Sequence, residues 1–414
     1  MEKIAVCIDS YNIDYSPSII NFLDCLSNDF EIDLYMRNVL FRKSNVLSKN
    51  NIRIYPIKDT ISYSFLWKTG KRMLKKVIKT ITLRKNTRSG KGPSKGLGGL
   101  SLNKVKKQTE KSDYYRHICI DPQGFLLCKE LFPASRPIYY SLELYLKDDY
   151  LDTYYPPRVM KELNRLMDRE RTMSNDIRAL IIQSKEKQEL FIKDYGLPAD
   201  LPVFILPVTY MGRAVKEKSN YLRETYDIPE DRHIAIHLGG MNDWFSCIEI
   251  AEVFEQMPDW VLFFQGNHNK SYLKKFDQVI SGEKAKNIIV SRAFYDQLES
   301  LDQIMMSADL GIAWYNNISK NFTNTGRSSG KIAAYMRFGL PTIAKKYPSM
   351  VEAIEEPGCG LCVDEYDEIK EAVKRIEGNF KFFSENALHE YEKTYWFENY
   401  RAGLLDFIQR QKYL

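Results

Sequence analysis

The stretch SSGK at residues 328–331 holds residue types that suit the binding of an anion. At the start of a helix the first backbone N–H groups have no partner within the helix, and the helix dipole places positive charge there. Gly330 lets a ligand approach the backbone closely, and Lys331 adds a full positive charge. Together with Ser329 they predict a phosphate or diphosphate site. The alternative interpretation is an ordinary capped helix with a solvated lysine.

The residues after this stretch predict the helix that would position it. Ile332, Tyr335 and Met336 have the spacing of one face of a helix, and the serine at position 329 can cap its start. Gly339 can end the helix, and residues 341–344 have the pattern of a short buried strand. A helix, a tight turn and a strand in this order are typical of a parallel sheet.

Strands and helices alternate along the whole chain. We expect strands in the first half at residues 4–9, 31–36, 117–121, 137–143, 178–184 and 203–207. We expect strands in the second half at residues 233–239, 260–266, 287–292, 309–315, 341–344 and 360–364. Two such series predict an α/β fold with two doubly wound, Rossmann-like domains. The predicted divisions are residues 1–212, residues 213–394 and a final helix at 395–414.

Ligands of doubly wound sheets bind beyond the carboxyl ends of the strands, so two such domains predict a central cleft between them. The helix that starts at Ser329 would face this cleft. The turns HLGGMND and FFQGNHN each follow a predicted strand and would face it too. In the first of these turns, Gly239 and Gly240 would let a ligand meet the backbone.

The net charge of +6 comes from one segment. Residues 71–111 hold fourteen Lys or Arg and one acidic residue, Glu110, which gives +13 and leaves 6 − 13 = −7 for the rest of the chain. Its first half predicts an amphipathic helix, and its Gly- and Ser-rich second half (84–101) predicts a flexible basic loop. A cationic face beside an apolar one favours an anionic membrane surface. Nucleic acid is less favoured because the segment has no aromatic residue to stack on bases, and a solvated insertion is the third interpretation.

The remaining composition is that of a soluble globular protein, with 44% hydrophobic residues and no run of 18 apolar residues. The first strand begins at residue 4 with no signal peptide before it, so the expected compartment is the cytoplasm. Seven scattered cysteines fit a reducing compartment. The pair in CGLC at 359–362 has no second Cys or His pair nearby, so packed thiols are favoured over zinc or redox chemistry.

Several of these motifs resemble those of the GT-B glycosyltransferases grouped in glycosyltransferase family four. SSGKIAAYMRFGLPTIA resembles the family pattern Pro-x-Lys-hydrophobic-x-Glu-Tyr-Met-x-x-Gly-x-Pro-x-hydrophobic, and VEAI with GCGLCVD resembles its continuation. ADLGIAWY (308–315) resembles the strand before the donor site, and PIYYSLEL (137–144) resembles the Tyr-Asp-x-His-Glu-Leu stretch. The resemblance covers nearly all of the chain except residues 71–111.

The resemblance implies that the anion is the diphosphate of a nucleotide sugar. Donors aimed at the leaving diphosphate would lower the barrier, so no metal and no cofactor would be needed. The donor-binding residues carried over by the resemblance are Gly239, Gly240, Arg292, Phe294, Arg327, Ser329, Gly330, Lys331 and Glu352. Arg292 and Phe294 would contact the base, although an exposed salt bridge and a core ring are equally compatible with them.

The chain departs from the family pattern at three places. The paired glutamates would fall at Gly326 and Ala334, so the usual ribose-binding carboxylate is missing. MNDWFSC (241–247) lacks the Arg and Lys that normally follow HLGG, and Arg327 with Lys331 would have to compensate. Leu142 replaces the acceptor-side histidine.

On the acceptor side, the predicted catalytic candidates are Glu143, Asp121 and His117, near predicted strand ends of the first domain. A carboxylate or histidine there would accept the acceptor hydroxyl proton in an inverting reaction. In the retaining reaction that the resemblance favours, the leaving phosphate assists instead. Glu143 is the stronger candidate because a carboxylate that ends an apolar strand needs a partner or ligand, whereas a structural role is favoured for His117.

The sequence therefore predicts a metal-independent, retaining hexosyltransferase at the inner face of the plasma membrane. It would use a nucleotide-sugar donor and a lipid-linked or polysaccharide acceptor in surface glycan biosynthesis, with residues 71–111 on the anionic membrane. A GT-B sugar-nucleotide epimerase and a catalytically inactive partner subunit are the alternatives. A homo- or hetero-oligomer remains open.

Overall fold

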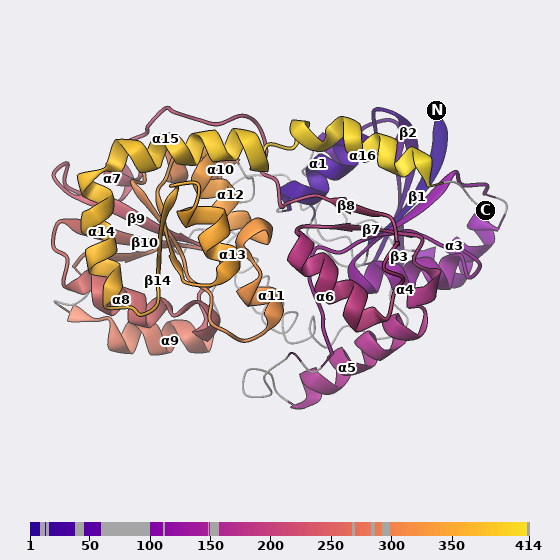
Figure 1. Cartoon of the computed structure of the whole chain (residues 1–414), viewed down its shortest axis with the longest axis horizontal. Coiled ribbons are helices and arrows are strands. Elements are labelled where there is room, and N and C mark those ends of the chain that lie inside the picture. Colours follow the sequence, from indigo (N-terminus) through magenta and orange to yellow (C-terminus); the bar gives the residue numbers. More distant parts are fainter. Residues whose placement is uncertain are drawn as a thin grey trace, which may run out of the picture.

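The computed structural model describes residues 1–8, 13, 16–37, 45–58, 100–110, 112–147, 149, 157–266, 270–282, 286–291 and 299–411. Two separate parallel sheets dominate this part of the chain, and each belongs to its own domain (Figure 1). The predicted α/β fold with two doubly wound domains is therefore confirmed.

The strands of the N-terminal sheet are β1 (Glu2–Ile8), β2 (Phe30–Arg37), β3 (Ile52–Lys58), β4 (Leu100–Ser101), β5 (Arg116–Ile120), β6 (Ile138–Tyr140), β7 (Ala179–Ile182) and β8 (Val203–Ile205). The helices of this domain are α1 (Pro17–Leu26), α3 (Leu102–Thr109), α4 (Asp121–Leu131), α5 (Pro157–Thr172) and α6 (Lys185–Tyr195).

The strands of the C-terminal sheet are β9 (His233–Leu238), β10 (Trp260–Gln265), β11 (Ile288–Val290), β12 (Leu310–Ala313), β13 (Thr342–Lys345) and β14 (Gly360–Val363). The longer helices that follow the linker are α7 (Tyr221–Tyr226), α8 (Cys247–Glu255), α9 (Lys270–Val279), α10 (Glu299–Met306), α12 (Gly330–Arg337), α14 (Glu368–Gly378), α15 (Phe380–Glu390) and α16 (Glu398–Arg410). The short helices are α11 (Lys320–Thr323) and α13 (Pro348–Met350).

All twelve predicted strands are present, but the sequence did not predict β3 and β4. Pro56 interrupts the pattern of β3, and β4 has only two residues at the end of a Gly- and Ser-rich stretch. β4 pairs with β3, so residues 100–101 belong to the sheet and not to the predicted loop. The predicted amphipathic helix and the rest of that loop lie outside the described residues.

Each sheet reverses its strand order once. The N-terminal order is β4-β3-β2-β1-β5-β6-β7-β8, and the C-terminal order is β11-β10-β9-β12-β13-β14. The reversals lie between β1 and β5 and between β9 and β12. In such sheets a crevice forms beyond the carboxyl ends of the two strands at the reversal. Functional residues are therefore expected after β1, β5, β9 and β12.

The core of each domain lies on both faces of its sheet, as it must when helices cover both faces. Along β1, Ile4, Val6 and Ile8 pack on one face, and Ala5 and Cys7 pack on the other. All five side chains are fully buried. This arrangement explains why the strands read as continuous apolar runs.

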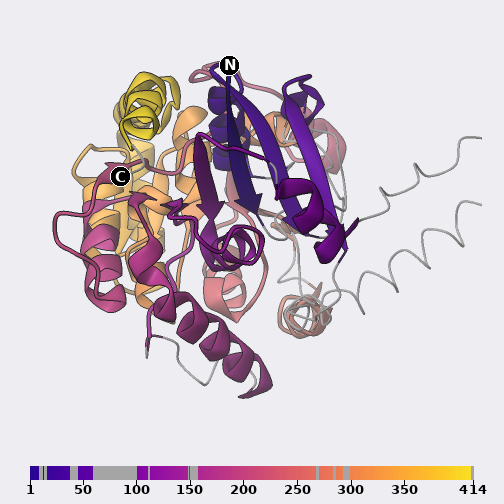
Figure 2. The ribbon, with the colours of Figure 1, turned by 90° about the vertical axis from the view of Figure 1, so that its right-hand side faces the viewer.

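The last helix, α16, returns to the domain in which the chain begins (Figure 1, Figure 2). Leu404 and Ile408 of α16 are fully buried in the same core cluster as β1. The Arg116 side chain, at the start of β5, donates through Nε to the Ile408 carbonyl at 3.1 Å and through Nη2 to the Gln409 carbonyl at 2.9 Å. These bonds satisfy carbonyl groups at the end of the helix that have no partner within it.

All seven cysteines are buried and unpaired, which agrees with packed thiols in CGLC. Among the described residues, no helix is both long enough and apolar enough to cross a membrane.

Candidate functional site

The start of α12 lies close to the reversal of the C-terminal sheet. Ser329 caps the helix, because its Oγ accepts a hydrogen bond from the Ile332 N–H at 3.3 Å. The Tyr315 hydroxyl, just beyond β12, lies 2.7 Å from Ser329 Oγ. A side chain added at Gly330 would meet no atom within 4 Å, so the space beside this glycine is open. The predicted capped helix is confirmed, and Gly339 ends it with φ +61°.

Lys331 is buried, with 9% of its surface exposed. Within the described part of the chain its Nζ has no hydrogen-bond partner. The ammonium lies 4.0 Å from the ring centre of Phe245 and 4.7 Å from that of Tyr315. Burial lowers the pKa of Lys331 to about 7. The alternative of a solvated lysine is therefore wrong, and a cation buried in this way is stabilised by an anionic partner.

Two elements hold Lys331 in place. The Tyr335 hydroxyl, one helical turn further on, accepts from the Leu238 N–H at 2.8 Å and so anchors α12 to β9. Gly239 follows β9 with φ +118°, and a Cβ built on it would lie 3.4 Å from Lys331 Cε. The strand end and the lysine therefore meet, with Gly240 directly after them in the chain. Residues with a side chain rarely adopt a φ of this value, so glycine suits this position.

The Arg327 guanidinium points to carboxylates of its own domain. Its Nη1 donates to Glu390 Oε1 at 2.7 Å, and its Nε lies 3.6 Å from Glu352 Oε1. Burial by itself lowers the pKa of Arg327, but the nearby Tyr395 and these carboxylates together raise it above its usual value. The backbone carbonyl of Arg327 accepts from the Val208 N–H at 2.9 Å, which places this residue where the chain crosses between domains. Arg327 and Glu352 thus pair with each other, and their role toward a donor stays a prediction.

The positions of the two missing glutamates leave no room for larger side chains. A Cβ at Gly326 would lie 1.9 Å from the Ser349 carbonyl oxygen. Ala334 is fully buried in the core of the C-terminal domain. The chain therefore cannot place carboxylates there without rearrangement.

In the N-terminal domain, Asp121 and Glu143 meet at the carboxyl ends of β5 and β6. Asp121 has φ +57°, and its Oδ1 accepts from the Leu142 N–H at 2.7 Å and the Glu143 N–H at 3.1 Å. Asp121 is buried, whereas Glu143 is exposed. Asp121 therefore holds the backbone that presents the Glu143 side chain.

Two residues that the sequence did not single out, Lys187 and Asn321, complete this group. Lys187 of α6 is 1% exposed, and its Nζ donates to Asn321 Oδ1 at 2.8 Å. Burial lowers the pKa of Lys187 to about 8, although the negative charges of Glu143 and Asp121 act to raise it. A lysine in the first turn of a helix opposes the helix dipole, and this is the one sequence signal that could have pointed to it. Asn321 gave no signal.

The two groups lie close to each other. The negative charge of Glu143 is one of the causes that raise the pKa of Tyr315, after the larger effect of burial. Tyr315 contacts both Ser329 and Lys331. Asn321, which donates to Glu143 at 2.7 Å, precedes Phe322, whose ring centre lies 5.8 Å from that of Tyr315, so the structure places Glu143 of one domain near Ser329 and Lys331 of the other.

His117 lies elsewhere. It is the second residue of β5, about 10 Å from the carboxyl end of that strand at ~3.3 Å per residue. The rings of Phe132 and Tyr114 pack against it, and burial lowers its pKa to about 4. This environment supports a structural role. Arg292 and Phe294 lie outside the described residues.

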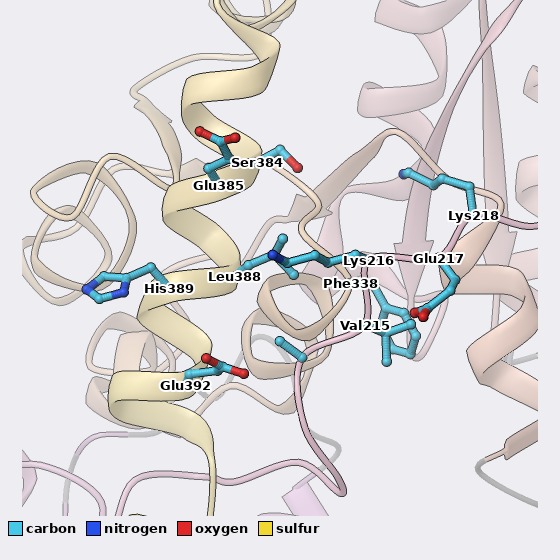
Figure 3. A pocket seen from close by; sticks show the side chains of 11 residues that line it. Val215, Lys216, Glu217, Lys218, Phe338, Ser384, Glu385, Leu388, His389 and Glu392 are labelled. Atoms are coloured by element: carbon cyan, nitrogen blue, oxygen red, sulfur yellow. The ribbon is translucent and has the colours of Figure 1, made fainter.

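A cavity of about 620 Å³ lies between linker residues 214–218 and α15 (Figure 3). Phe338 lines it at the C-terminal end of α12, opposite to the end that carries Lys331. Its charged lining mixes Lys216, Glu217 and Glu385, so it shows no preference for an anion. This cavity is distinct from the site at Ser329 and Lys331.

Comparison with known proteins agrees with this architecture. The family model described as Glucosyltransferase 3-like, C-terminal domain, matches residues 262–381. The search of curated proteins found no match.

Solved structures of three proteins resemble the whole chain. HepE from Anabaena, in complex with UDP and glucose, is 13% identical with a TM-score of 0.65, and the match covers 99% of this chain and 100% of HepE. Sucrose-phosphate synthase from Thermosynechococcus elongatus is 11% identical with a TM-score of 0.69 and 99% coverage of both chains. A TarM variant from S. aureus, in complex with fondaparinux, alpha-GlcNAc-glycerol and UDP, is 11% identical with a TM-score of 0.62, covering 99% of this chain and all of that one. These likenesses establish the GT-B fold.

Proposed function

We propose that this protein is a glycosyltransferase that moves a sugar from a nucleotide-sugar donor to a lipid-linked or polysaccharide acceptor. The observation that carries the proposal is Lys331, a buried ammonium without a hydrogen-bond partner among the described residues, beside the capped start of α12. Burying an unpaired cation is costly, and a diphosphate would supply the missing charge. The family-model match and the GT-B fold support the same reading.

The donor diphosphate would lie between Ser329, Gly330, Lys331 and the backbone of Gly239 and Gly240. Backbone N–H groups at the start of α12 and the Lys331 ammonium would stabilise the charge that develops on the leaving phosphate. This assistance suits a retaining transfer without a metal. UDP is the first nucleotide to test, because the HepE and TarM structures contain it.

Glu143 would contact the acceptor or the transferred sugar. It stands at the carboxyl end of β6 and belongs to the domain opposite the one that would hold the diphosphate. In an inverting transfer its carboxylate would accept the proton of the acceptor hydroxyl. In a retaining transfer it would hold a hydroxyl group of the sugar. Arg327, Glu352, Arg292 and Phe294 remain proposed donor contacts on the resemblance alone, and Asp121 is proposed to position Glu143.

The test is thermal stabilisation of the protein by a panel of UDP, GDP, CMP and dTDP sugars, repeated with Lys331→Met. A ligand of the folded state stabilises it by about 2.7 kcal/mol at a hundredfold excess over Kd. We expect one nucleotide class to stabilise the wild type and to lose most of this effect in the variant. Lys346→Met is the control, because Lys346 is half exposed and follows β13 of the same sheet. Equal stabilisation of Lys331→Met and wild type would overturn the proposed site.

A catalytically inactive partner subunit is the second candidate. The tight packing at Gly326 and Ala334 favours it, because the two carboxylates of the family pattern have no room there. This candidate predicts that no nucleotide sugar in the panel stabilises the protein.

A further inference from the structure

The side chain of Asn321 joins the two domains by three hydrogen bonds. Its Oδ1 accepts from the Leu144 N–H at 3.2 Å and from Lys187 Nζ at 2.8 Å. Its Nδ2 donates to Glu143 Oε2 at 2.7 Å. Asn321 belongs to α11 of the C-terminal domain, and its three partners belong to the N-terminal domain.

The surroundings fix the orientation of this amide. Turning it over would direct its NH₂ group at the Leu144 N–H and the Lys187 ammonium, and its oxygen at the Glu143 carboxylate. An aspartate would satisfy the two donors but would oppose Glu143 with a second negative charge. An amide is therefore the group that satisfies all three partners.

A neighbouring bond fastens the same helix. The Lys320 N–H donates to Asp149 Oδ2 at 2.6 Å, so α11 contacts the segment after β6 at two points. Figure 1 shows α11 on the side of the C-terminal domain that faces α6. A separate contact between the domains, from Val208 to Arg327, lies where the chain crosses. Opening the domains would break the bonds of Asn321, because all three of its partners lie in the other domain.

We propose that Asn321 is a positioning residue that orients the Glu143 carboxylate only when the two domains are closed. Lys187 keeps the amide in its orientation, and the amide then donates to Glu143. The inference rests on the proposed function, because it holds that the bond from Asn321 to Glu143 serves sugar transfer. It adds a residue from the donor-side domain to the acceptor side of the site.

The first test is steady-state kinetics of Asn321→Ala with the nucleotide sugar that the stabilisation panel selects. We expect kcat to fall about tenfold or more, while KM for the donor stays within about threefold. In the double variant with Glu143→Gln, Asn321→Ala should cause no further loss. An additive loss would overturn the inference, because Asn321 would then act without Glu143.

Two variants separate positioning from structural support. Asn324→Ala is the matched control, because Asn324 follows α11 and, among the described residues, its Nδ2 bonds only within that segment, to Lys320 and Thr323. It should keep the wild-type kcat. Asn321→Asp restores the acceptor for Leu144 and Lys187 but removes the donor to Glu143, so its kcat should remain low. Rescue by Asn321→Asp, or an equal loss in Asn324→Ala, would overturn the inference.

Small-angle scattering without ligand tests the contact independently of activity. Asn321→Ala should have a larger radius of gyration than wild type and Asn324→Ala, because the domains separate more easily. An unchanged radius would overturn the role of Asn321 in closure. If no nucleotide sugar binds the wild type, the proposed function fails, and the scattering result still decides whether Asn321 holds the domains together.

Discussion

The buried ammonium of Lys331 predicts that ligand binding depends on pH. In the free protein its pKa is lowered to about 7, and a bound diphosphate favours the charged form, so binding above pH 7 takes up a proton. We expect Kd for the selected nucleotide sugar to rise between pH 7 and 9, by up to about tenfold per pH unit. Isothermal titration calorimetry at several pH values measures this dependence. Lys331→Met should bind the nucleotide sugar weakly, and its Kd should change less with pH. If the Kd of the variant changes with pH as much as that of the wild type, another group takes up the proton.

The same lysine affects stability. Its folded-state pKa of about 7 lies below the value of about 10.4 expected in the unfolded chain. Between these values the unfolded chain binds a proton that the folded chain lacks, so the free energy of unfolding should rise with pH over this window. Urea unfolding at pH 7 and pH 9 measures the change. Lys331→Met should show a smaller rise than wild type.

Gly326 is a position at which a single methyl group should be costly. Its Cβ would lie 1.9 Å from the Ser349 carbonyl oxygen, so Gly326→Ala should lower the free energy of unfolding by about 1–3 kcal/mol. Gly330→Ala is the matched control, since a Cβ there meets nothing within 4 Å, and it should change stability by less than about 0.5 kcal/mol. Urea unfolding of both variants measures the difference, and equal losses would contradict the packing argument.

At the scale of elements, local pattern predicted most of the fold. The apolar runs of β1, β9 and β10 are buried on both faces, so their composition alone marks them as strands. The cap at Ser329 is also local, because donor and acceptor are three residues apart. β3 and β4 were missed because proline and a Gly-rich context hide short strands from such patterns.

The sequence predicted those parts of the candidate site whose residues belong to a single element. The capped start of α12 with Lys331 was found from its own sequence. Lys187 and Asn321 were missed because they are 134 positions apart and meet only through the packing of two domains. Arg327 was expected at the diphosphate, and no local pattern reveals its pairing with Glu390, 63 positions later.

The packing of α16 on the N-terminal domain yields a prediction for an element. Leu404 is fully buried in the cluster that contains β1, so Leu404→Ala should cost about 2–5 kcal/mol. Denaturant unfolding monitored in each domain measures the loss, which should appear in the N-terminal domain. Gln409→Ala, on the exposed side of the same helix, should be nearly neutral. A loss of stability confined to the C-terminal domain would contradict the packing of α16 on the N-terminal domain.

At the scale of the whole molecule, charge separation predicts membrane binding. Residues 71–111 carry a net charge of +13, and the rest of the chain carries −7. In the described part of this segment, three of its lysines lie on α3: Lys104, Lys106 and Lys107. We expect the protein to sediment with anionic vesicles and not with neutral ones, and less at high salt. Replacing the three lysines with Gln should weaken binding by on the order of a hundredfold, at ~1 kcal/mol each.

The control replaces three exposed basic residues of the C-terminal domain, Lys370, Lys374 and Arg375 of α14. This variant has the same net charge as the α3 variant. It should sediment with anionic vesicles as wild type does. Equal weakening of both variants would mean that total charge, and not the segment at 71–111, governs binding.

The return of α16 also has a consequence for synthesis of the chain. The strands of the first domain end at Ile205, but Leu404 and Ile408 complete the core around β1. At ~5–20 residues per second, a ribosome needs roughly 10–40 s to make the intervening stretch of about 200 residues. During that time the first domain has an open apolar surface where α16 will dock. We expect chaperones to bind this surface of the nascent chain until α16 has been made.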